Sequence, residues 1–295
     1  MKPTFKPLDQ QVIVITGASS GIGLATAQEA IARGACVVAS ARSAEDLDAF
    51  VCASGSQATA IAADVADAAQ VRRIAEHAIE HFGRIDTWIN NAGVSIYGRI
   101  EDITEVDNRR LFDTNFWGVV NGSLTALAHL RGRGGVLINL GSEVSDAIVP
   151  LQGMYSASKH AVKGFTDALR VELEADGVPV SVTLIQPTAV DTPFPQHARN
   201  YMDREPRLPD PRIAPSAVAE AILEAATSQK RDVAVGYMAT LNTMVSTLAP
   251  ALGDRMAAKQ MDRQQDDVPP RDPAGSLHEA RGGGRTRGRT PAASS

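Results

Sequence analysis

Hydrophobic runs alternate with amphipathic segments along most of the chain. Six runs are apolar at successive positions, which is typical of strands buried on both faces of a parallel sheet. They cover residues 12–15, 36–39, 58–61, 85–89, 136–140 and 180–185. Helical patterns lie between them, near 21–33, 44–53, 67–82, 104–130 and 153–175. This repetition predicts an α/β fold with a single Rossmann-type doubly wound parallel sheet and helices on both faces.

The regular pattern weakens after residue 186. Seven prolines between residues 187 and 215 are too many for regular structure, and such a long insertion in an α/β domain is usually functional or mobile. A helix over 216–227, a strand over 233–235 and an apolar helix over 239–258 are then expected to complete a domain spanning residues 1–265. Residues 266–295 are rich in proline, glycine and arginine, which predicts a disordered tail.

Charge divides unevenly between the tail and the rest of the chain. Residues 271–295 carry five arginines and two acidic residues, a net charge of +3, whereas the whole chain carries −5. The tail arginines could contact RNA or an acidic partner, but a solvated tail is the favoured interpretation. The remainder is acidic and has no basic stripe, so we expect no nucleic-acid partner.

The composition is typical of a soluble protein with one large core. With 295 residues and 44% hydrophobic content, the chain can bury a full core. No apolar run approaches the roughly 20 residues of a membrane-spanning helix, and the N-terminus has no apolar signal core, so we expect a cytoplasmic protein without a membrane partner. Cys36 and Cys52 have no metal-site or redox spacing, and no metal is expected.

A glycine-rich segment follows the first predicted strand. Residues 16–23 read TGASSGIG and run directly into a helical pattern. Glycines at a strand-to-helix turn let the backbone approach a pyrophosphate, which backbone amides and the helix N-terminus then hold. An ordinary tight turn is the alternative. The flanking strand and helix favour a dinucleotide site.

The spacing of these glycines, G-x-x-x-G-x-G, resembles the shorter, non-extended branch of the short-chain dehydrogenase/reductase family. Further matches follow in the family's order: NNAG at 90–93, Asn115, Ser142, YSASK at 155–159 and PTAVDT at 187–192. Together they cover about residues 8–258. The resemblance implies an oxidoreductase that passes a hydride between a nicotinamide and a carbonyl or secondary alcohol.

Four residues are the candidate catalytic set. Tyr155 and Lys159 lie four residues apart, on one helical face. A phenol with a pKa near 10 is a poor base at neutral pH, but an adjacent ammonium favours the phenolate, which can exchange a proton with the substrate. The resemblance implies that Ser142 holds the substrate oxygen, that Lys159 also contacts the nicotinamide ribose and that Asn115 anchors a proton-relaying water. Ser142 could instead cap a turn, with Ser145 as its rival, and Asn115 could bond to backbone in the core.

The end of the second strand indicates the cofactor. An acidic residue there would accept hydrogen bonds from a ribose 2′-hydroxyl and repel a 2′-phosphate, but Ala41 and then Arg42 occupy the position. A guanidinium suits a phosphate, which predicts NADP(H), although a surface arginine is the alternative. The predicted cofactor-binding residues are Thr16, Gly17, Ser19, Ser20, Gly21, Ile22, Gly23, Arg42, Asp64, Val65, Asn91, Ala92, Gly93, Tyr155, Lys159, Pro187, Thr188, Val190 and Thr192.

Three positions depart from the family pattern. Gly141 replaces a common serine, and Thr188 replaces a common glycine, which places the local backbone shape in doubt. Glu143 directly follows the candidate catalytic serine. Its carboxylate could bind a polar group or exclude acids, but a solvent-facing side chain is the favoured interpretation.

The substrate is not specified by the sequence, nor is the reaction direction. Residues that follow strand ends suggest an apolar cleft and a bulky hydrophobic substrate: Val94, Ile96, Tyr97, Val144, Ile148, Val149, Leu151, Phe194, Tyr201 and Met202. An epimerase or dehydratase of the extended branch and a cofactor-sensing module on the same fold are the alternative functions. The long helices near 104–130 and 153–175 are apolar on more than one face, which predicts a homodimer or homotetramer.

Overall fold

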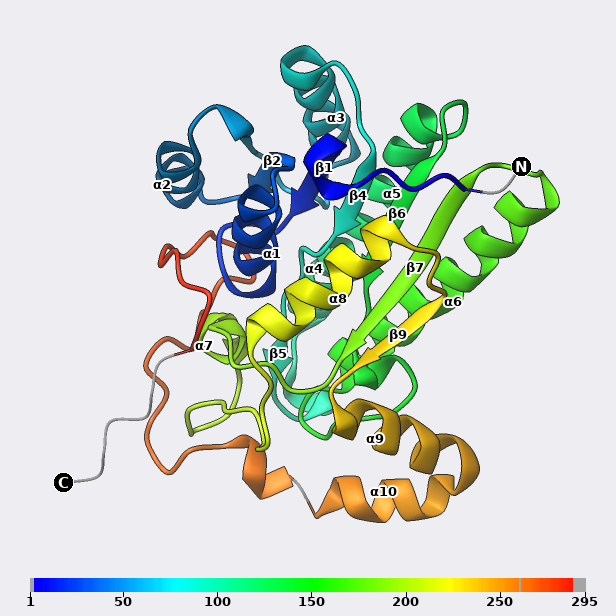
Figure 1. Ribbon diagram of the computed structural model, residues 1–295. Coiled ribbons are helices and arrows are strands. Elements are labelled where there is room, and N and C mark those ends of the chain that lie inside the picture. Colours follow the sequence, from blue (N-terminus) through cyan, green and yellow to red (C-terminus); the bar gives the residue numbers. More distant parts are fainter. Residues whose placement is uncertain (1–2, 260, 289–295) are drawn as a thin grey trace.

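The computed structural model describes residues 3–259 and 261–288, and within them seven parallel strands form one sheet in the order β3-β2-β1-β4-β6-β7-β9 (Figure 1). The strands are β1 (Val12–Thr16), β2 (Cys36–Ala41), β3 (Ala58–Ala62), β4 (Thr87–Asn90), β6 (Gly135–Leu140), β7 (Val180–Pro187) and β9 (Asp232–Val235). Every residue of β1, β4, β6 and β7 is buried. The continuous apolar runs therefore mark strands covered on both faces, as predicted.

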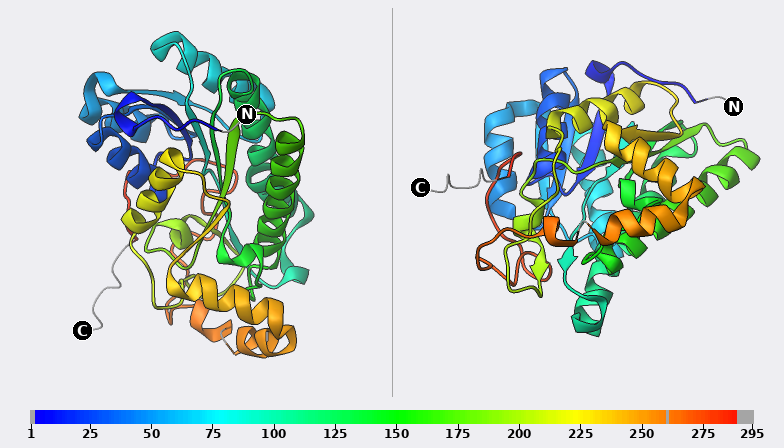
Figure 2. Two further views of the ribbon diagram at one scale, coloured as in Figure 1. Left: turned by 45° about the vertical axis from the view of Figure 1, so that its right-hand side comes forward. Right: turned by 90° about the horizontal axis from the view of Figure 1, so that it is seen from below.

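Helices cover the two faces of this sheet in two groups. On one face lie α1 (Gly21–Ala32), α2 (Ala44–Ser54) and α8 (Pro215–Thr227), and on the other lie α3 (Ala68–Phe82), α5 (Gly118–Leu130) and α6 (Gly153–Ala175). Figure 2 shows α8 and α6 on opposite sides of β7. This arrangement confirms the predicted doubly wound fold.

Local signals define where several helices begin and end. Asp67 accepts hydrogen bonds from the backbone amides of Ala69 and Gln70 at the start of α3, which satisfies two of the amides that a helix start leaves without partners. At the other end Gly83 is left-handed, with φ of 75°, as glycine readily allows. Thr104 caps α4 (Glu105–Phe112) through the amide of Asp107.

Two predicted helices are interrupted. The helix expected over 104–130 changes to a π-helical turn at Asp113–Trp117 between α4 and α5. The helix expected over 239–258 is two helices, α9 (Tyr237–Leu248) and α10 (Pro250–Ala258). Pro250 has no backbone N–H to continue α9, so it begins a new helix instead. None of the described helices is long and apolar enough to cross a membrane.

The proline-rich region contains short elements. Helix α7 (Phe194–His197) precedes β8 (Arg199–Asn200), which pairs with β5 (Ile96–Tyr97) in a separate two-stranded sheet. The C-terminal segment, residues 266–288, then lies against this layer, because Asn200 N donates to Pro273 O at 2.9 Å and Ser276 N donates to His197 O at 2.7 Å. In Figure 1 it is the red ribbon near α7 and α2.

This path differs from the disordered tail predicted for residues 266–295. Leu277 is fully buried among Val94, Ile96, Ile103 and Leu111. The backbone carbonyls of Ser276, Leu277 and His278 accept hydrogen bonds from the Arg42 guanidinium. The composition of the segment does not reveal these contacts. Residues 289–295 of the predicted tail lie outside the described residues.

Candidate active site

The glycine-rich turn joins β1 to α1 and is fastened to the end of β4. Gly17 and Gly21 have φ of 68° and 56°, a region that side chains disfavour. The hydroxyl of Thr16 accepts from the amides of Asn91 and Ala92 at 3.0 and 3.2 Å, and Asn91 Nδ2 donates to Gly17 O at 3.1 Å. A Cβ at Gly23 would lie 2.2 Å from Gly17 O. The turn is thus held in one shape by contacts that only glycine permits.

A cavity of about 410 Å³ opens at the carboxyl ends of the strands beside this turn. Nearly all the predicted cofactor-binding residues line it, from Gly17 to Thr192. Thr16 and Gly23 do not line it. Thr16 is bonded to the amides of Asn91 and Ala92, and Gly23 packs against Gly17 O within the turn. The residues present fit a dinucleotide, since a glycine-lined turn at a helix N-terminus leaves space that a Cβ would fill.

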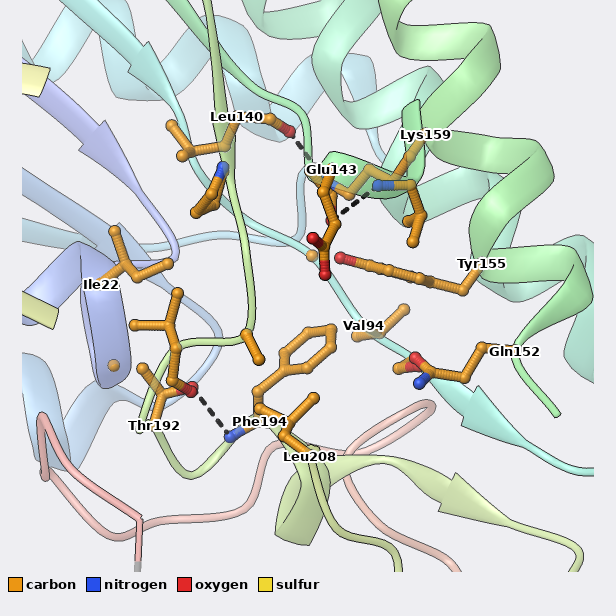
Figure 3. A pocket seen from close by; sticks show the side chains of 18 of the residues that line it. Ile22, Val94, Leu140, Glu143, Gln152, Tyr155, Lys159, Thr192, Phe194 and Leu208 are labelled. Carbon is orange, nitrogen blue, oxygen red and sulfur yellow. Dashed lines mark hydrogen bonds between the residues drawn. The ribbon is translucent and has the colours of Figure 1, made fainter. Parts of the chain in front are cut away.

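Tyr155 and Lys159 project from α6 into the same cavity (Figure 3). Lys159 Nζ donates to Leu140 O at 2.7 Å and lies 5.8 Å from the centre of the Tyr155 ring. Burial lowers the pKa of Lys159 to about 8 and raises the pKa of Tyr155 to about 12. A hydrogen bond with Ser142 opposes the rise at Tyr155. The predicted proton-transfer pair is therefore assembled in one place.

The structure distinguishes between the two candidate serines. Ser145 is buried and its hydroxyl accepts from the Ser142 amide at 3.2 Å, whereas Ser142 lines the cavity. Ser142 also caps the short turn that follows it, since its hydroxyl accepts from Val144 N at 3.3 Å. The predicted residue faces the cavity and its rival supports the loop.

Asn115 lies in the π-helical turn and is completely buried. Its Oδ1 accepts from Val94 N at 2.8 Å, and its Nδ2 donates to Val94 O at 2.9 Å and to Ser158 Oγ at 3.1 Å. These contacts match the alternative role of a core asparagine that bonds to backbone. They fix the loop after β4 against α6. The proton-relay role remains a prediction.

The Glu143 side chain points into the cavity and is bonded there, which differs from the favoured interpretation of a solvent-facing side chain. Its side chain lines the cavity, and its Oε2 accepts from Thr188 Oγ1 at 3.0 Å and from Asn242 Nδ2 at 2.9 Å. Burial raises the pKa of Glu143. Asn242 comes from α9, 99 residues later in the chain, so the sequence offered no sign of this contact.

The C-terminal segment covers the end of the cavity where Arg42 lies. The Arg42 guanidinium donates to the backbone carbonyls of Ser276, Leu277 (3.1 Å) and His278 (3.3 Å). At the glycine-rich turn, Gly21 N donates to Arg285 O at 2.8 Å. Two groups predicted to bind cofactor phosphates are therefore hydrogen-bonded to the protein's own backbone.

Additional contacts fasten this segment. Arg110 donates to Leu277 O at 3.2 Å and pairs with Asp64. His278 Nε2 lies 2.7 Å from Asp107 Oδ1. Asp107 is 9% exposed and hydrogen bonds lower its pKa against the opposing effect of burial, so it is an ionised anchor for His278.

The predicted apolar cleft is partly as expected. Five of the ten residues line the cavity: Val94, Val144, Ile148, Val149 and Phe194. The remaining five lie outside its lining: Ile96, Tyr97, Leu151, Tyr201 and Met202. Ile96 and Tyr97 are buried in β5, and the Tyr201 hydroxyl donates to Asp107 at 2.8 Å. The sequence missed lining residues from distant elements, namely Gln152, Leu208, Met238, Asn242, Val245 and Met256.

Known proteins resemble this chain both in sequence and in fold. The short chain dehydrogenase family matches residues 11–203. An uncharacterized oxidoreductase of Bacillus subtilis, YxnA, is 47% identical over 278 residues, which cover 92% of this chain and 78% of that protein.

Two solved structures have the same fold over most of this chain. A short chain dehydrogenase/reductase from Burkholderia phymatum in complex with NAD is 26% identical, with a TM-score of 0.72 over 90% of this chain and 99% of that one. An alcohol dehydrogenase from the archaeon Thermococcus sibiricus, complexed with 5-hydroxy-NADP, is 25% identical, with a TM-score of 0.67 over 76% and 95%.

Proposed function

Because this chain belongs to the short chain dehydrogenase family, we propose that it is an NADP(H)-dependent oxidoreductase that transfers a hydride between the nicotinamide and a carbonyl or secondary alcohol. One observation carries the proposal. Ser142, Tyr155 and Lys159 meet in a single cavity that also contains the glycine-rich turn. Proton transfer and dinucleotide binding are thus available side by side.

The three side chains divide the work on the substrate oxygen. Ser142 and Tyr155 hold that oxygen, and Tyr155 donates its hydroxyl proton during reduction or accepts one during oxidation. A bound nicotinamide dinucleotide supplies or receives the hydride. Lys159, buried beside the ring of Tyr155, favours the phenolate when it carries its proton. Its ammonium can also donate to a ribose hydroxyl.

NADP(H) is preferred in this proposal because Arg42 offers a guanidinium to a 2′-phosphate and Ala41 offers no carboxylate to repel one. The related structures were solved with an NADP derivative in one case and with NAD in the other. The preference for NADP(H) in this proposal therefore rests on Arg42 and Ala41 of this chain. Asp64 and Val65, which line the same end of the cavity, would contact the adenosine.

The substrate in this proposal is largely hydrophobic. Apolar side chains from separate elements line the cavity that contains Tyr155, among them Ile148, Phe194 and Met238. The rings of Tyr155 and Phe194 lie 5.6 Å apart between centroids, so an apolar group that follows the reacting carbon would contact an aromatic face.

We also propose that the protein is a homodimer or homotetramer. Large apolar side chains are exposed on the outer surfaces of α5, α6 and the π-helical turn: Trp117 is 52% exposed, Leu124 56% and Val171 60%. Burying these side chains in a shared interface would stabilise α6, which carries Tyr155 and Lys159.

The test is the variant Tyr155→Phe. It removes only the hydroxyl, so kcat for NADPH oxidation with a ketone should fall by about 10²- to 10⁴-fold, while the dissociation constant for NADPH changes little. Tyr237→Phe is the matched control, because Tyr237 is 78% exposed. Tyr155→Phe activity equal to that of Tyr237→Phe would refute the assignment.

A further inference from the structure

Glu143 presents half of a partly buried carboxylate to the substrate side of the cavity. Its Oε2 is occupied by Thr188 and Asn242, whereas Oε1 receives no hydrogen bond from any residue that the structure describes. Glu143 also forms no ion pair within the described part of the chain. Figure 3 shows its carboxylate directed toward the hydroxyl end of Tyr155.

Such a group can accept a further hydrogen bond from a bound molecule. An ionised carboxylate accepts about four hydrogen bonds, so Oε1 has acceptor capacity that a donor in the cavity can use. The charge of Glu143 also raises the pKa of Tyr155, which opposes formation of the phenolate. A carboxylate in this place therefore hinders the proposed proton transfer until a donor neutralises part of its charge.

The position of Oε1 limits where that donor can be. Figure 3 shows the Glu143 carboxylate near the hydroxyl end of Tyr155, and both residues line the cavity with Ser142. A molecule whose oxygen contacts Ser142 and Tyr155 therefore has its neighbouring atoms close to Glu143. Thr188 and Asn242 both donate to the other oxygen, Oε2. They fix the orientation of the carboxylate and leave Oε1 as the free acceptor.

We propose that Glu143 is a specificity-determining residue that binds a hydroxyl or amino group carried by the substrate close to the reacting carbon. The inference rests on the proposed function, and it narrows the substrate class to hydroxy or amino ketones, or the corresponding alcohols, with an apolar remainder. Substrates with a carboxylate at that position are excluded by charge repulsion.

The experiment measures binding without turnover. Tyr155→Phe protein saturated with NADPH is titrated with three ketones of similar size: acetophenone, α-hydroxyacetophenone and α-aminoacetophenone. In the last two the donor is on the carbon next to the carbonyl. A hydrogen bond to a charged partner corresponds to about a 10- to 150-fold difference in affinity. We expect at least one of the two donor-bearing ketones to bind about 10-fold or more tightly than acetophenone, and the two arms distinguish a hydroxyl from an amine.

The same titrations are repeated with Glu143→Leu and Glu143→Gln in that background. Leucine should abolish the preference for the donor-bearing ketones. Glutamine, which keeps an acceptor oxygen and can still meet Thr188, should retain part of a preference for the hydroxyl and lose a preference for the amine. Melting temperatures of both variants check that the fold is intact.

The result that overturns the inference is equal binding of all three ketones, no binding of any, or a preference that survives in Glu143→Leu. Failure of the proposed function has a different signature. It would appear as wild-type protein that binds a donor-bearing ketone together with NADPH and yet oxidises no NADPH.

Discussion

Removal of residues 271–295 is expected to have two opposite effects, although deletion of a disordered tail, as predicted from its composition, would be neutral. The segment buries Leu277 completely and occupies the guanidinium of Arg42 and the amide of Gly21. The truncated protein should therefore be less stable. It should also bind NADPH more tightly, because a 2′-phosphate no longer competes with backbone carbonyls for Arg42.

The magnitudes follow from these contacts. Full burial of a leucine contributes about 1.5 to 3 kcal/mol, and each kcal/mol shifts the melting temperature of a domain of this size by about 2 to 4 °C. The loss is then about 3 to 12 °C. Breaking the hydrogen bonds of a charged guanidinium costs about 1.5 to 3 kcal/mol, so truncation should lower the dissociation constant for NADPH by about 10- to 150-fold.

The assay is titration of NADPH fluorescence together with thermal unfolding. A shorter deletion, of residues 289–295, is the matched control, because it leaves the contacts of Leu277, Arg42 and Gly21 in place. Equal NADPH affinity in the two truncated proteins would show that the segment does not compete for Arg42. Weaker binding by the longer truncation would show that the segment contributes to the cofactor-bound site.

Four further outcomes are expected. Lys159→Met should remove a pH dependence of stability: the folded pKa of Lys159 is about 8 and the unfolded value about 10.4, so the unfolded state binds more protons between these pH values. The free energy of unfolding of the wild type should accordingly rise relative to the variant by up to about 3 kcal/mol as pH increases through this window in chemical denaturation, and parallel curves would refute it. Arg42→Asp should shift preference from NADPH toward NADH by 10-fold or more in competition kinetics; an unchanged ratio would mean that Arg42 does not contact the phosphate. Gly23→Ala should weaken binding of both cofactors, because its Cβ would lie 2.2 Å from Gly17 O; wild-type dissociation constants would contradict this close contact. Light scattering at micromolar concentration should give the mass of a dimer or tetramer, and a monomeric mass would exclude the proposed interface.

The sheet could be predicted because its strands are buried on both faces. Continuous apolar runs leave few alternatives when helices alternate with them, and every residue of β6 and β7 is buried. The glycine-rich turn could be predicted for a related reason. Its function depends on the absence of side chains at Gly17 and Gly23, which is visible in the sequence itself.

Contacts between distant segments could not be predicted in the same way. Arg42 and Leu277 are joined through a backbone carbonyl, 235 residues apart, and a carbonyl is present at every residue. By composition, residues 271–295 contain one large aliphatic side chain, Leu277, and composition does not reveal such backbone acceptors. Glu143 is a similar case, because its orientation depends on Asn242. The sequence predicted the helix that carries Asn242 but not its contact with Glu143, 99 residues away.

The groups around the cavity suggest that cofactor binding is an exchange of hydrogen bonds. Arg42 and Gly21 are bonded to the C-terminal segment, whereas Lys159 is bonded to Leu140 in β6. At the adenosine end the cofactor therefore competes with the C-terminal segment, which truncation removes. At the nicotinamide end it competes with a carbonyl of β6, which truncation leaves in place. Binding of adenosine 2′,5′-bisphosphate should become about 10-fold tighter or more when residues 271–295 are deleted. Binding of nicotinamide mononucleotide should change by much less. Equal changes for the two fragments in calorimetric titrations would mean that the segment affects the whole cavity and not one end of it.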